Sequence, residues 1–172
     1  DRTCVSCTSS GNTCVSTGTK IYPSNAIKQL PGWTYNQGFK TTSCAGYNFL
    51  GKYGSGGIAT GPVKITEPHK SIIMSFRLAP IDSWDYEHFY ISADNVLVFD
   101  QYFWTYADGK SNICHSGWWE EVQTFTIGFA HSSPDLTLKF WSSLDQAADD
   151  EAWGIGDITF TLTDCQVDKW GR

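Results

Sequence analysis

Residues 72–78 read IIMSFRL, a stretch in which Ile72, Met74, Phe76 and Leu78 alternate with Ile73, Ser75 and Arg77. Side chains at every second position of a β-strand point to the same face, so this alternation predicts a strand with one buried face. The same period of two recurs in the segments 124–129, 136–141 and 158–163. The sequence therefore predicts several strands that each bury one side.

Turn-forming residues separate these segments, for example Asp94-Asn95, Ala107-Asp108-Gly109 and the run 132–135. No segment shows a sustained helical stripe bounded by capping residues. Short alternating strands of this kind predict an all-β fold, an antiparallel two-sheet sandwich that is jelly-roll-like. With 172 residues, of which 41% are hydrophobic, the chain can bury the core of one such domain.

The first 20 residues differ in composition from the rest of the chain. They are rich in Ser, Thr, Gly and Cys and contain almost nothing to bury, so apolar burial cannot fold them. We expect a short disulfide-stapled, cysteine-rich N-terminal extension over residues 1–20, followed by a β-sandwich domain over residues 21–172. Because the chain starts at Asp1 and not at Met, we also expect a mature or excised fragment.

The cysteines are even in number and comprise Cys4, Cys7, Cys14, Cys44, Cys114 and Cys165. Together with Gly-rich and Ser-rich connections, they favour an oxidising compartment and three disulfides. The spacing Cys4-x-x-Cys7 also suits zinc, but a structural zinc site needs four ligands, and no second pair is recognisable. We expect Cys44 to pair with Cys114, because both lie in the domain body, and Cys165 to pair with one of the N-terminal three.

Charge and hydropathy argue against two classes of partner. The formal net charge of −6, with Arg2, Arg77 and Arg172 as the only arginines, disfavours binding to a phosphate backbone. No apolar run is long enough to cross a membrane, and no signal-peptide pattern opens the chain. We therefore expect an extracellular or cell-surface protein that binds no nucleic acid and does not insert into a membrane.

Two acidic segments, residues 82–87 and 145–157, stand out in a sparsely charged chain, and each contains a tryptophan. Clustered carboxylates repel one another unless solvent or a cation compensates, and calcium binds about six to eight oxygen ligands. We predict a calcium site shared by both segments, with the candidate ligands Asp82, Asp85, Glu87, Asp145, Asp150, Glu151 and Asp157. The alternative is that residues 149–151 form a solvated turn. No EF-hand spacing is present, so the fold would have to assemble the site.

The same acidic residues provide the best argument for an enzyme. Asp85 and Glu87, two apart on a strand, would share one face, and paired carboxylates on a jelly roll serve some glycoside hydrolases. The second acidic segment gives these side chains a metal-binding explanation, and the sequence offers no separate acid and nucleophile. We therefore expect a non-catalytic protein, with a glycoside hydrolase that uses Asp85 and Glu87 as the less favoured alternative.

Aromatic residues make up 15% of the chain, more than one sandwich core obviously requires. Many flank the loop that contains Cys114, at Tyr102, Phe103, Trp104, Tyr106, Trp118 and Trp119. Exposed rings on a rigid β scaffold suit stacking on a sugar face or contact with a protein. We take Trp104, Trp118 and Trp119 as candidate ligand-binding residues, although Phe103 and Trp104 could equally fill the core.

Several short motifs follow one another in a fixed order: TSCAG at 42–46, GKYG at 51–54, EPH at 67–69, IDSWDYE at 81–87, His131, Leu144-Asp145 and DEAWGI at 150–155. In this order they resemble a domain repeated in large secreted and surface proteins of ciliates and other protists. That domain commonly follows cysteine-rich repeats, and residues 3–14 are similar to the end of such a repeat. The resemblance implies a surface location and a jelly-roll-like domain, but no activity. Ala45 and Lys52, where glycine is expected, and Ala152, where serine is usual, depart from the pattern.

Two functions from different classes remain open at this point. The first is an adhesion or binding module that recognises a glycan or a surface protein, with calcium ordering its loops. The second is a structural subunit of an extracellular coat, matrix or filament, which self-assembles through the cysteine-rich N-terminus and unpaired strand edges. Specific sugar binding by a monomer would support the first, and ordered oligomers without ligand affinity would support the second.

Overall fold

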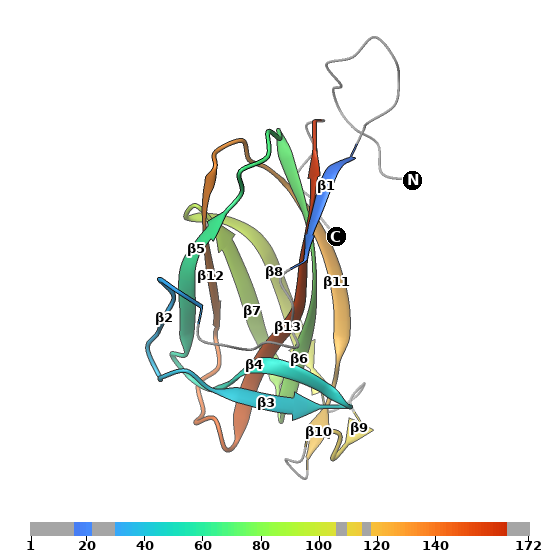
Figure 1. Ribbon diagram of the computed structural model, residues 1–172. Helices are drawn as coiled ribbons and strands as arrows, with labels where there is room; N and C mark the ends of the chain where they lie inside the picture. Colours follow the sequence, from blue (N-terminus) through green and yellow to red (C-terminus); the bar gives the residue numbers. More distant parts are fainter. Residues whose placement is uncertain (1–15, 22–29, 106–109, 115–117, 165–172) are drawn as a thin grey trace.

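The computed structural model describes residues 16–21, 30–105, 110–114 and 118–164, which are almost entirely β-strands and their connections. Two antiparallel sheets pack face to face (Figure 1). This arrangement confirms the predicted all-β, two-sheet sandwich.

Each sheet has a simple strand order. The first sheet consists of β11 (Gln123–Ala130), β6 (Ser71–Asp82), β13 (Glu151–Thr163), β4 (Tyr47–Tyr53) and β3 (Thr41–Cys44), with β1 (Ser16–Ile21) also paired to β13. The second sheet consists of β2 (Thr34–Tyr35), β5 (Ile58–Lys64), β12 (Asp135–Ser142), β7 (Asp85–Ala93) and β8 (Val96–Trp104). A two-stranded ribbon of β9 (Lys110–Ser111) and β10 (Trp119–Glu120) lies at one end of the sandwich (Figure 1).

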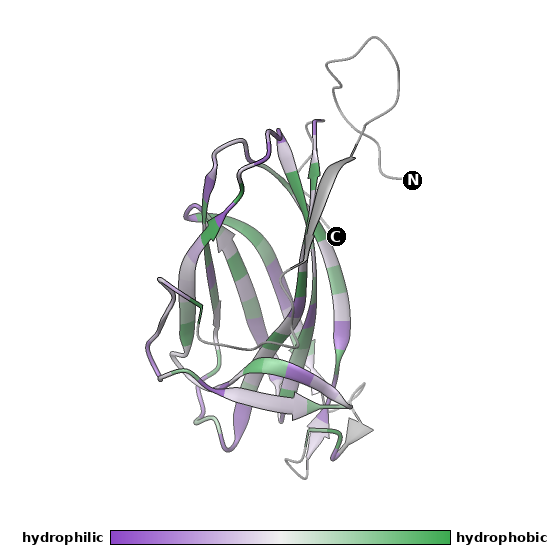
Figure 2. Ribbon diagram, in the orientation of Figure 1, coloured by the Kyte–Doolittle hydropathy of each residue, from purple (hydrophilic) through white to green (hydrophobic). Residues whose placement is uncertain are grey.

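The segment that predicts the fold forms the middle of β6. Its apolar set, Ile72, Met74, Phe76 and Leu78, is fully buried, whereas Ile73, Ser75 and Arg77 are partly exposed. β6 pairs with β11 on one side and with β13 on the other, so its inner face lies near the centre of the core. The alternation is visible along the strands as bands of hydrophobic and hydrophilic residues (Figure 2).

The second sheet closes the core with its own alternating residues. Phe89, Ile91, Leu136, Leu138 and Phe140 are all buried to within 1% of full burial. Side chains of this size each stabilise the fold by about 1.5–3 kcal/mol when they are removed from water. The inner faces of the two sheets therefore supply the main driving force for folding.

The tryptophans of the two acidic segments are core residues. Trp84 and Trp153 are fully buried. The indole Nε1 of Trp84 donates a hydrogen bond to the backbone carbonyl of Ala152 at 2.9 Å. The ring of Trp153 packs against those of Tyr53 and Phe89, with centroids 4.9 and 5.2 Å away. The two segments are therefore anchored to each other through the core.

The alternating pattern does not predict β4, because one of its inward positions is a glycine. Gly51 lies between the buried Phe49 and Tyr53, and it has a φ of 144°. A Cβ at this position would lie 2.5 Å from the carbonyl oxygen of Trp153. The close approach of β4 to β13 thus requires glycine where the pattern would need an apolar side chain.

The predicted Cys44–Cys114 disulfide is present. It joins the end of β3 to the connection between β9 and β10, where the amide of Ala45 also donates to the carbonyl of Ile113 at 2.7 Å. The other four cysteines lie outside the described residues. β1 begins at Ser16, so the last residues of the expected extension pair with β13. Among the described residues there is no helix long and apolar enough to cross a membrane.

Candidate functional site

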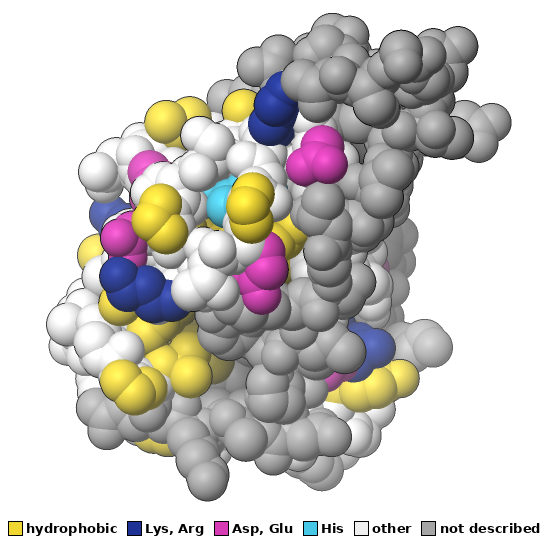
Figure 3. Space-filling view, turned by 45° about the horizontal axis from the view of Figure 1, so that its top comes forward, with side chains coloured by type: hydrophobic (Ala, Val, Ile, Leu, Met, Phe, Trp, Pro, Cys, Tyr) yellow, Lys and Arg dark blue, Asp and Glu magenta, His cyan; other side chains and the backbone are white. Residues whose placement is uncertain are grey.

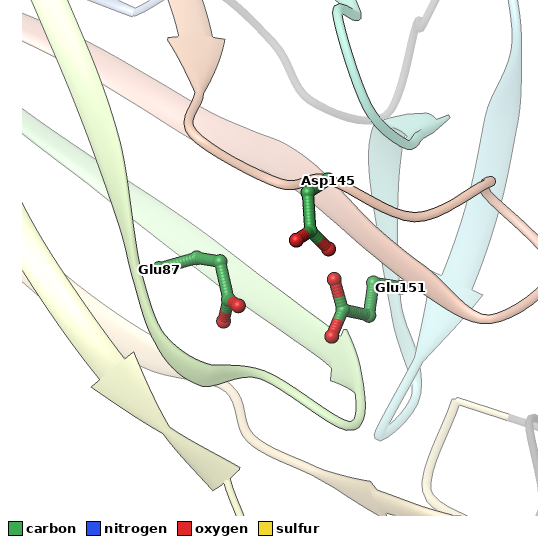
Figure 4. Close-up of side chains that lie close together, drawn as sticks. All are labelled: Glu87, Asp145 and Glu151. Atoms are coloured by element: carbon green, nitrogen blue, oxygen red, sulfur yellow. The ribbon is translucent and has the colours of Figure 1, made fainter.

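Three of the seven predicted metal ligands lie together at the end of the sandwich where β7 and β13 begin. Each of Glu87, Asp145 and Glu151 offers a carboxylate oxygen that lies within 4.8 Å of those of the other two. The three carboxylates turn toward one another (Figure 4). Glu87 belongs to β7, Glu151 to β13, and Asp145 to the connection between β12 and β13. The acidic cluster therefore contains residues from strands of both sheets.

The other four carboxylates are placed differently. Asp82 ends β6 opposite Glu151 in the register, but it is not part of the cluster, and its backbone carbonyl accepts a hydrogen bond from Thr105 Oγ1 at 2.6 Å. Asp85 and Asp150 are exposed beside the cluster. Asp157 lies farther along β13, at a bulge, and forms an ion pair with Arg77.

The position of Asp157 corrects one expectation from the sequence. The acidic segment 145–157 shows no strand alternation, but β13 begins at Glu151 and residues 151–156 are buried. These residues do not alternate in polarity because both faces of the strand are covered at this point. Six residues of strand separate Asp157 from Glu151 by roughly 20 Å, so Asp157 cannot join the cluster.

Several backbone contacts fix the connection that carries Asp145. The amide of Ser143 donates to the carbonyl of His88 at 2.9 Å, and the amide of His88 donates to Ser143 Oγ at 2.8 Å. On the other side, the amide of Ser55 donates to the carbonyl of Gln146 at 2.7 Å. Asp145 therefore lies between two points of attachment, and its side chain is held facing Glu87 (Figure 4).

Burial and like charge act together on Glu151. Its side chain is 1% exposed, and its Oε1 accepts a hydrogen bond from Gln146 Nε2 at 3.2 Å. Its Oε2 has no hydrogen-bond partner in the described part of the chain. Burial, followed by the charges of Glu87 and Asp145, raises the pKa of Glu151 to about 7. The pKa of Glu87 is also raised, mainly by burial and then by its hydrogen bond with Asp85. The cluster therefore holds more negative charge than its surroundings stabilise.

Asp85 and Glu87 do not form a pair of carboxylates spaced across a substrate groove. Tyr86 between them has a φ of 92°, and the pairing of β7 with β8 shifts register at this point. The side chain of Glu87 folds back so that its Oε2 accepts the amide of Asp85 at 2.6 Å. The simple strand alternation expected for these two residues is therefore broken.

A second group of candidate functional residues covers the outer surface of the second sheet. We call this surface the outer aromatic face, and it consists of Tyr86, His88, Tyr90, Tyr102, Trp104 and Trp141. Tyr86 is 56% exposed, and Tyr102 and Trp104 are each 42% exposed. The rings of Tyr86 and Trp104 are stacked, with centroids 5.1 Å apart and planes inclined by 23°. These rings present a continuous apolar surface to solvent.

The aromatic contacts continue across the sheet toward β12. His88 contacts Tyr102 and stacks on Tyr90, with centroids 6.0 and 5.7 Å away. Tyr90 in turn stacks on Trp141, its cross-strand partner, at 5.2 Å. Polar groups lie along the same surface: His88 Nδ1 contacts the Asp100 carboxylate, and the Lys139 amine lies over the Trp141 ring. The face thus combines flat rings with hydrogen-bonding groups at their edges.

The sequence identified one member of this face directly. Trp104, a candidate ligand-binding residue by its sequence, is exposed, while the neighbouring Phe103 is buried in the core. Trp118 and Trp119 are about 40% exposed, but they lie at the β9–β10 ribbon and not on the sheet that carries Trp104. Three of the rings that the sequence analysis missed, His88, Tyr90 and Trp141, alternate with the buried Phe89, Ile91 and Phe140. This period of two is the signal that could have found them.

The opposite end of the sandwich has a different character. It carries a pocket lined by the end of the β7–β8 hairpin and by β11, including Val96, Phe129 and His131. His131 Nδ1 lies 2.7 Å from His69 Nε2, so the two histidines serve as hydrogen-bonding partners there. On the view of this end in Figure 3, acidic and basic side chains are scattered among apolar ones.

The chain is related to known proteins by its fold and not by its sequence. No protein-family model matches it, and none of the curated proteins matches it. Its structure is similar to the C-terminal CBM6 of LamC, a marine laminarinase from Zobellia galactanivorans, with a TM-score of 0.52 and 12% identity over 84% of this chain and 99% of that chain. It is also similar to dimeric latent PorU from Porphyromonas gingivalis, with a TM-score of 0.56 and 8% identity. That match covers 95% of this chain and 14% of PorU. These similarities show that the chain shares a β-sandwich fold with these structures.

Proposed function

We propose that this protein is a non-catalytic glycan-binding module that acts outside the cell or at its surface, as an adhesion domain. The outer aromatic face is the observation that carries this proposal. Tyr86, Tyr102 and Trp104 are exposed, in mutual contact and held on a rigid sheet. A large exposed apolar patch on a folded domain typically marks an interaction site.

The chemistry of the face suits a sugar ring. Sugars have apolar C–H faces and polar edges, so they bind best where flat aromatic rings are bordered by hydrogen-bonding groups. The stacked pair Tyr86 and Trp104 offers such a platform, and the Asp100 carboxylate and His88 imidazole lie on the same surface. Tyrosine and tryptophan also lose little conformational entropy on binding, because each has only two side-chain torsions.

The dimensions of the face favour a chain of sugars over a single ring. The aromatic contacts run from Trp104 on β8, across β7, to Trp141 on β12. With a rise of about 3.3 Å per residue and a strand spacing of about 4.8 Å, the stripe is roughly 15–20 Å long. We therefore favour an oligosaccharide or polysaccharide ligand.

Three further points support the proposal. The fold is similar over nearly the full length of the LamC CBM6, a carbohydrate-binding module by its name, although fold-level similarity alone does not assign a ligand. The Cys44–Cys114 disulfide is typical of proteins in oxidising compartments, which supports an extracellular location. The resemblance to surface proteins of protists points to the same location.

The structure gives little support to a hydrolase. Glu151 has the raised pKa expected of an acid catalyst, but it is 1% exposed and so has no direct access to a bulky substrate. Glu87 accepts the amide of Asp85 through its Oε2, and its carboxylate lies within the cluster beside Asp145 and Glu151. We therefore propose a binding function and no catalytic one.

A glycan array, followed by titration calorimetry with the best ligand, tests the proposed function. The wild-type protein should bind a defined set of oligosaccharides as a monomer. The double variant Tyr86→Ala, Trp104→Ala should lose that binding while it keeps its melting temperature within a few degrees. Absence of binding on the array, or binding that the double variant retains, would contradict the proposal.

A further inference from the structure

One carboxylate oxygen in the acidic cluster is buried without a hydrogen-bond partner among the residues that the structure describes. Glu151 is 1% exposed, and its Oε2 accepts no hydrogen bond. Leaving a buried charged oxygen unpaired is strongly unfavourable, so native proteins pair such groups or place them against a metal ion. The oxygen belongs to a side chain that faces Asp145 and Glu87 (Figure 4). The carboxylate with the unpaired oxygen therefore lies beside two further carboxylates.

The spacing of the cluster suits an ion better than a shared proton. Two carboxylates that share a proton approach to about 2.5–2.7 Å, and such a contact would give Glu151 Oε2 a hydrogen-bond partner, which it lacks. In contrast, calcium binds oxygen at about 2.3–2.6 Å, so oxygens on opposite sides of one ion are roughly 5 Å apart. Three oxygens that lie within 4.8 Å of one another can therefore surround a single ion.

The ligand types select the class of ion. All three side chains are carboxylates, and no described His or Cys belongs to the cluster, whereas zinc and copper sites commonly use these residues. Calcium accepts irregular sets of oxygen ligands and fills its remaining positions with water, whereas magnesium demands a near-ideal octahedron. Three carboxylates also supply more than enough charge to neutralise a divalent cation.

We propose that Glu87, Asp145 and Glu151 hold one divalent cation of the calcium type, which joins the two sheets at this end of the sandwich. This narrows the seven carboxylates expected from the sequence to three. The bound ion provides a partner for the buried Oε2 of Glu151, and its positive charge offsets the electrostatic repulsion among the three carboxylates. It fixes the start of β7 to the start of β13.

The cation also acts on the outer aromatic face, a consequence that rests on the proposed function. Tyr86 immediately precedes Glu87, and its ring stacks on Trp104. Holding the Glu87 carboxylate restrains the backbone next to Tyr86, which has a φ of 92°. We therefore expect glycan affinity to fall when the cation is removed. Cation binding itself is measured without glycan, so failure of either proposal can be recognised separately.

Terbium luminescence and thermal unfolding of the disulfide-intact protein test the site. Terbium replaces calcium in oxygen sites and emits when a nearby tryptophan is excited. Trp84 is near the site, because its indole Nε1 donates a hydrogen bond to the backbone carbonyl of Ala152, the residue after Glu151. The wild-type protein should show sensitised emission that calcium displaces. Its melting temperature should rise by roughly 5–10 °C when calcium exceeds the dissociation constant a hundredfold, compared with chelator.

Glu151→Gln and Asp149→Asn form the matched pair of variants. Glu151→Gln keeps the shape of the side chain but removes its charge, so it should fold in chelator, at least as stably as the wild type, and lose both the emission and the calcium-dependent rise. Asp149 is exposed in the connection between β12 and β13 that also carries Asp145, but it is not part of the cluster. Asp149→Asn should therefore behave like the wild type. A wild type whose melting temperature is the same in calcium and chelator would overturn the proposal. A rise that persists in Glu151→Gln would also overturn it, because the ion would then bind elsewhere.

Discussion

The two sheets of this sandwich have similar inner faces and very different outer faces. Inside, both are lined by buried Ile, Leu and Phe side chains. Outside, the sheet with β6, β11 and β13 carries mainly hydroxyl side chains, namely Ser75, Thr124, Thr126, Thr159 and Thr161. The sheet with β7, β8 and β12 carries the outer aromatic face instead. Apart from residues 151–156, where both faces of β13 are covered, the fold requires only the inner faces to be apolar. The exposed rings on one outer face therefore need a different explanation, and the proposed glycan binding provides one.

The sharpest form of this comparison lies within one strand. Phe140 and Trp141 are neighbours in β12, but Phe140 is fully buried and stacks on Trp33, while Trp141 lies on the outer face against Tyr90. Phe140→Ala should lower the free energy of unfolding by about 3–5 kcal/mol, because it leaves a cavity in the core. Trp141→Ala should lower it by less than about 1 kcal/mol. Urea unfolding of both variants measures the difference, and equal losses would show that the outer rings are part of the core.

The acidic cluster should make stability depend on pH when no cation is bound. The pKa of Glu151 in the folded protein, about 7, lies above its ordinary value of 4.5, so folding favours the protonated form. The stabilisation is therefore fully present below about pH 4.5 and is lost as the pH rises through 7, by up to about 3 kcal/mol. Urea unfolding in chelator between pH 5 and 8 should show this decline. Glu151→Gln should remove it, and an unchanged decline in that variant would assign it to other groups.

A smaller effect is expected at the far end of the aromatic stripe. Trp141→Ala removes the ring over which the Lys139 amine lies and on which Tyr90 stacks. If the ligand is a chain of sugars, the affinity of the Trp141→Ala variant for a long oligosaccharide should fall about tenfold, or roughly 1.4 kcal/mol. The affinity of the variant for the shortest oligosaccharide that binds at Trp104 should change little. Titration with ligands of increasing length makes this comparison, and an equal loss for all lengths would argue for a single compact site.

The smallest effect should come from the hydroxyl-rich face. Thr126 is exposed on β11, and its Oγ1 lies 3.3 Å from Ser75 Oγ. Thr126→Val keeps the shape and the strand preference of the side chain. We expect stability to change by no more than about 0.5 kcal/mol and glycan affinity to stay the same. A measurable loss of glycan affinity in this variant would show that part of the binding surface lies on the sheet with β6, β11 and β13, contrary to the proposal.

The inner faces could be predicted from the sequence, but the assembled sites could not be predicted in full. Alternation revealed β6, β11, β12 and the second half of β13, because each buries only one face. Alternation did not reveal residues 151–156 as a strand, because both faces of β13 are covered there. Asp157 was therefore wrongly predicted to lie beside Glu151. The register of β7 against β8 brings Tyr86 onto Trp104 through a local shift, and such a shift depends on tertiary contacts that no periodicity encodes.

The central claim is that the outer aromatic face binds the ligand, and Trp104 and Tyr47 provide the most direct test of it. Both rings are about equally exposed, at 42% and 43%, but Tyr47 lies in β4 of the other sheet, where Arg77 stacks on it. Calorimetric titration of Trp104→Ala and Tyr47→Ala with the glycan selected on the array compares them. We predict that Trp104→Ala weakens binding by about tenfold to a hundredfold and that Tyr47→Ala leaves it within about twofold. Equal affinities for the two variants would contradict the account.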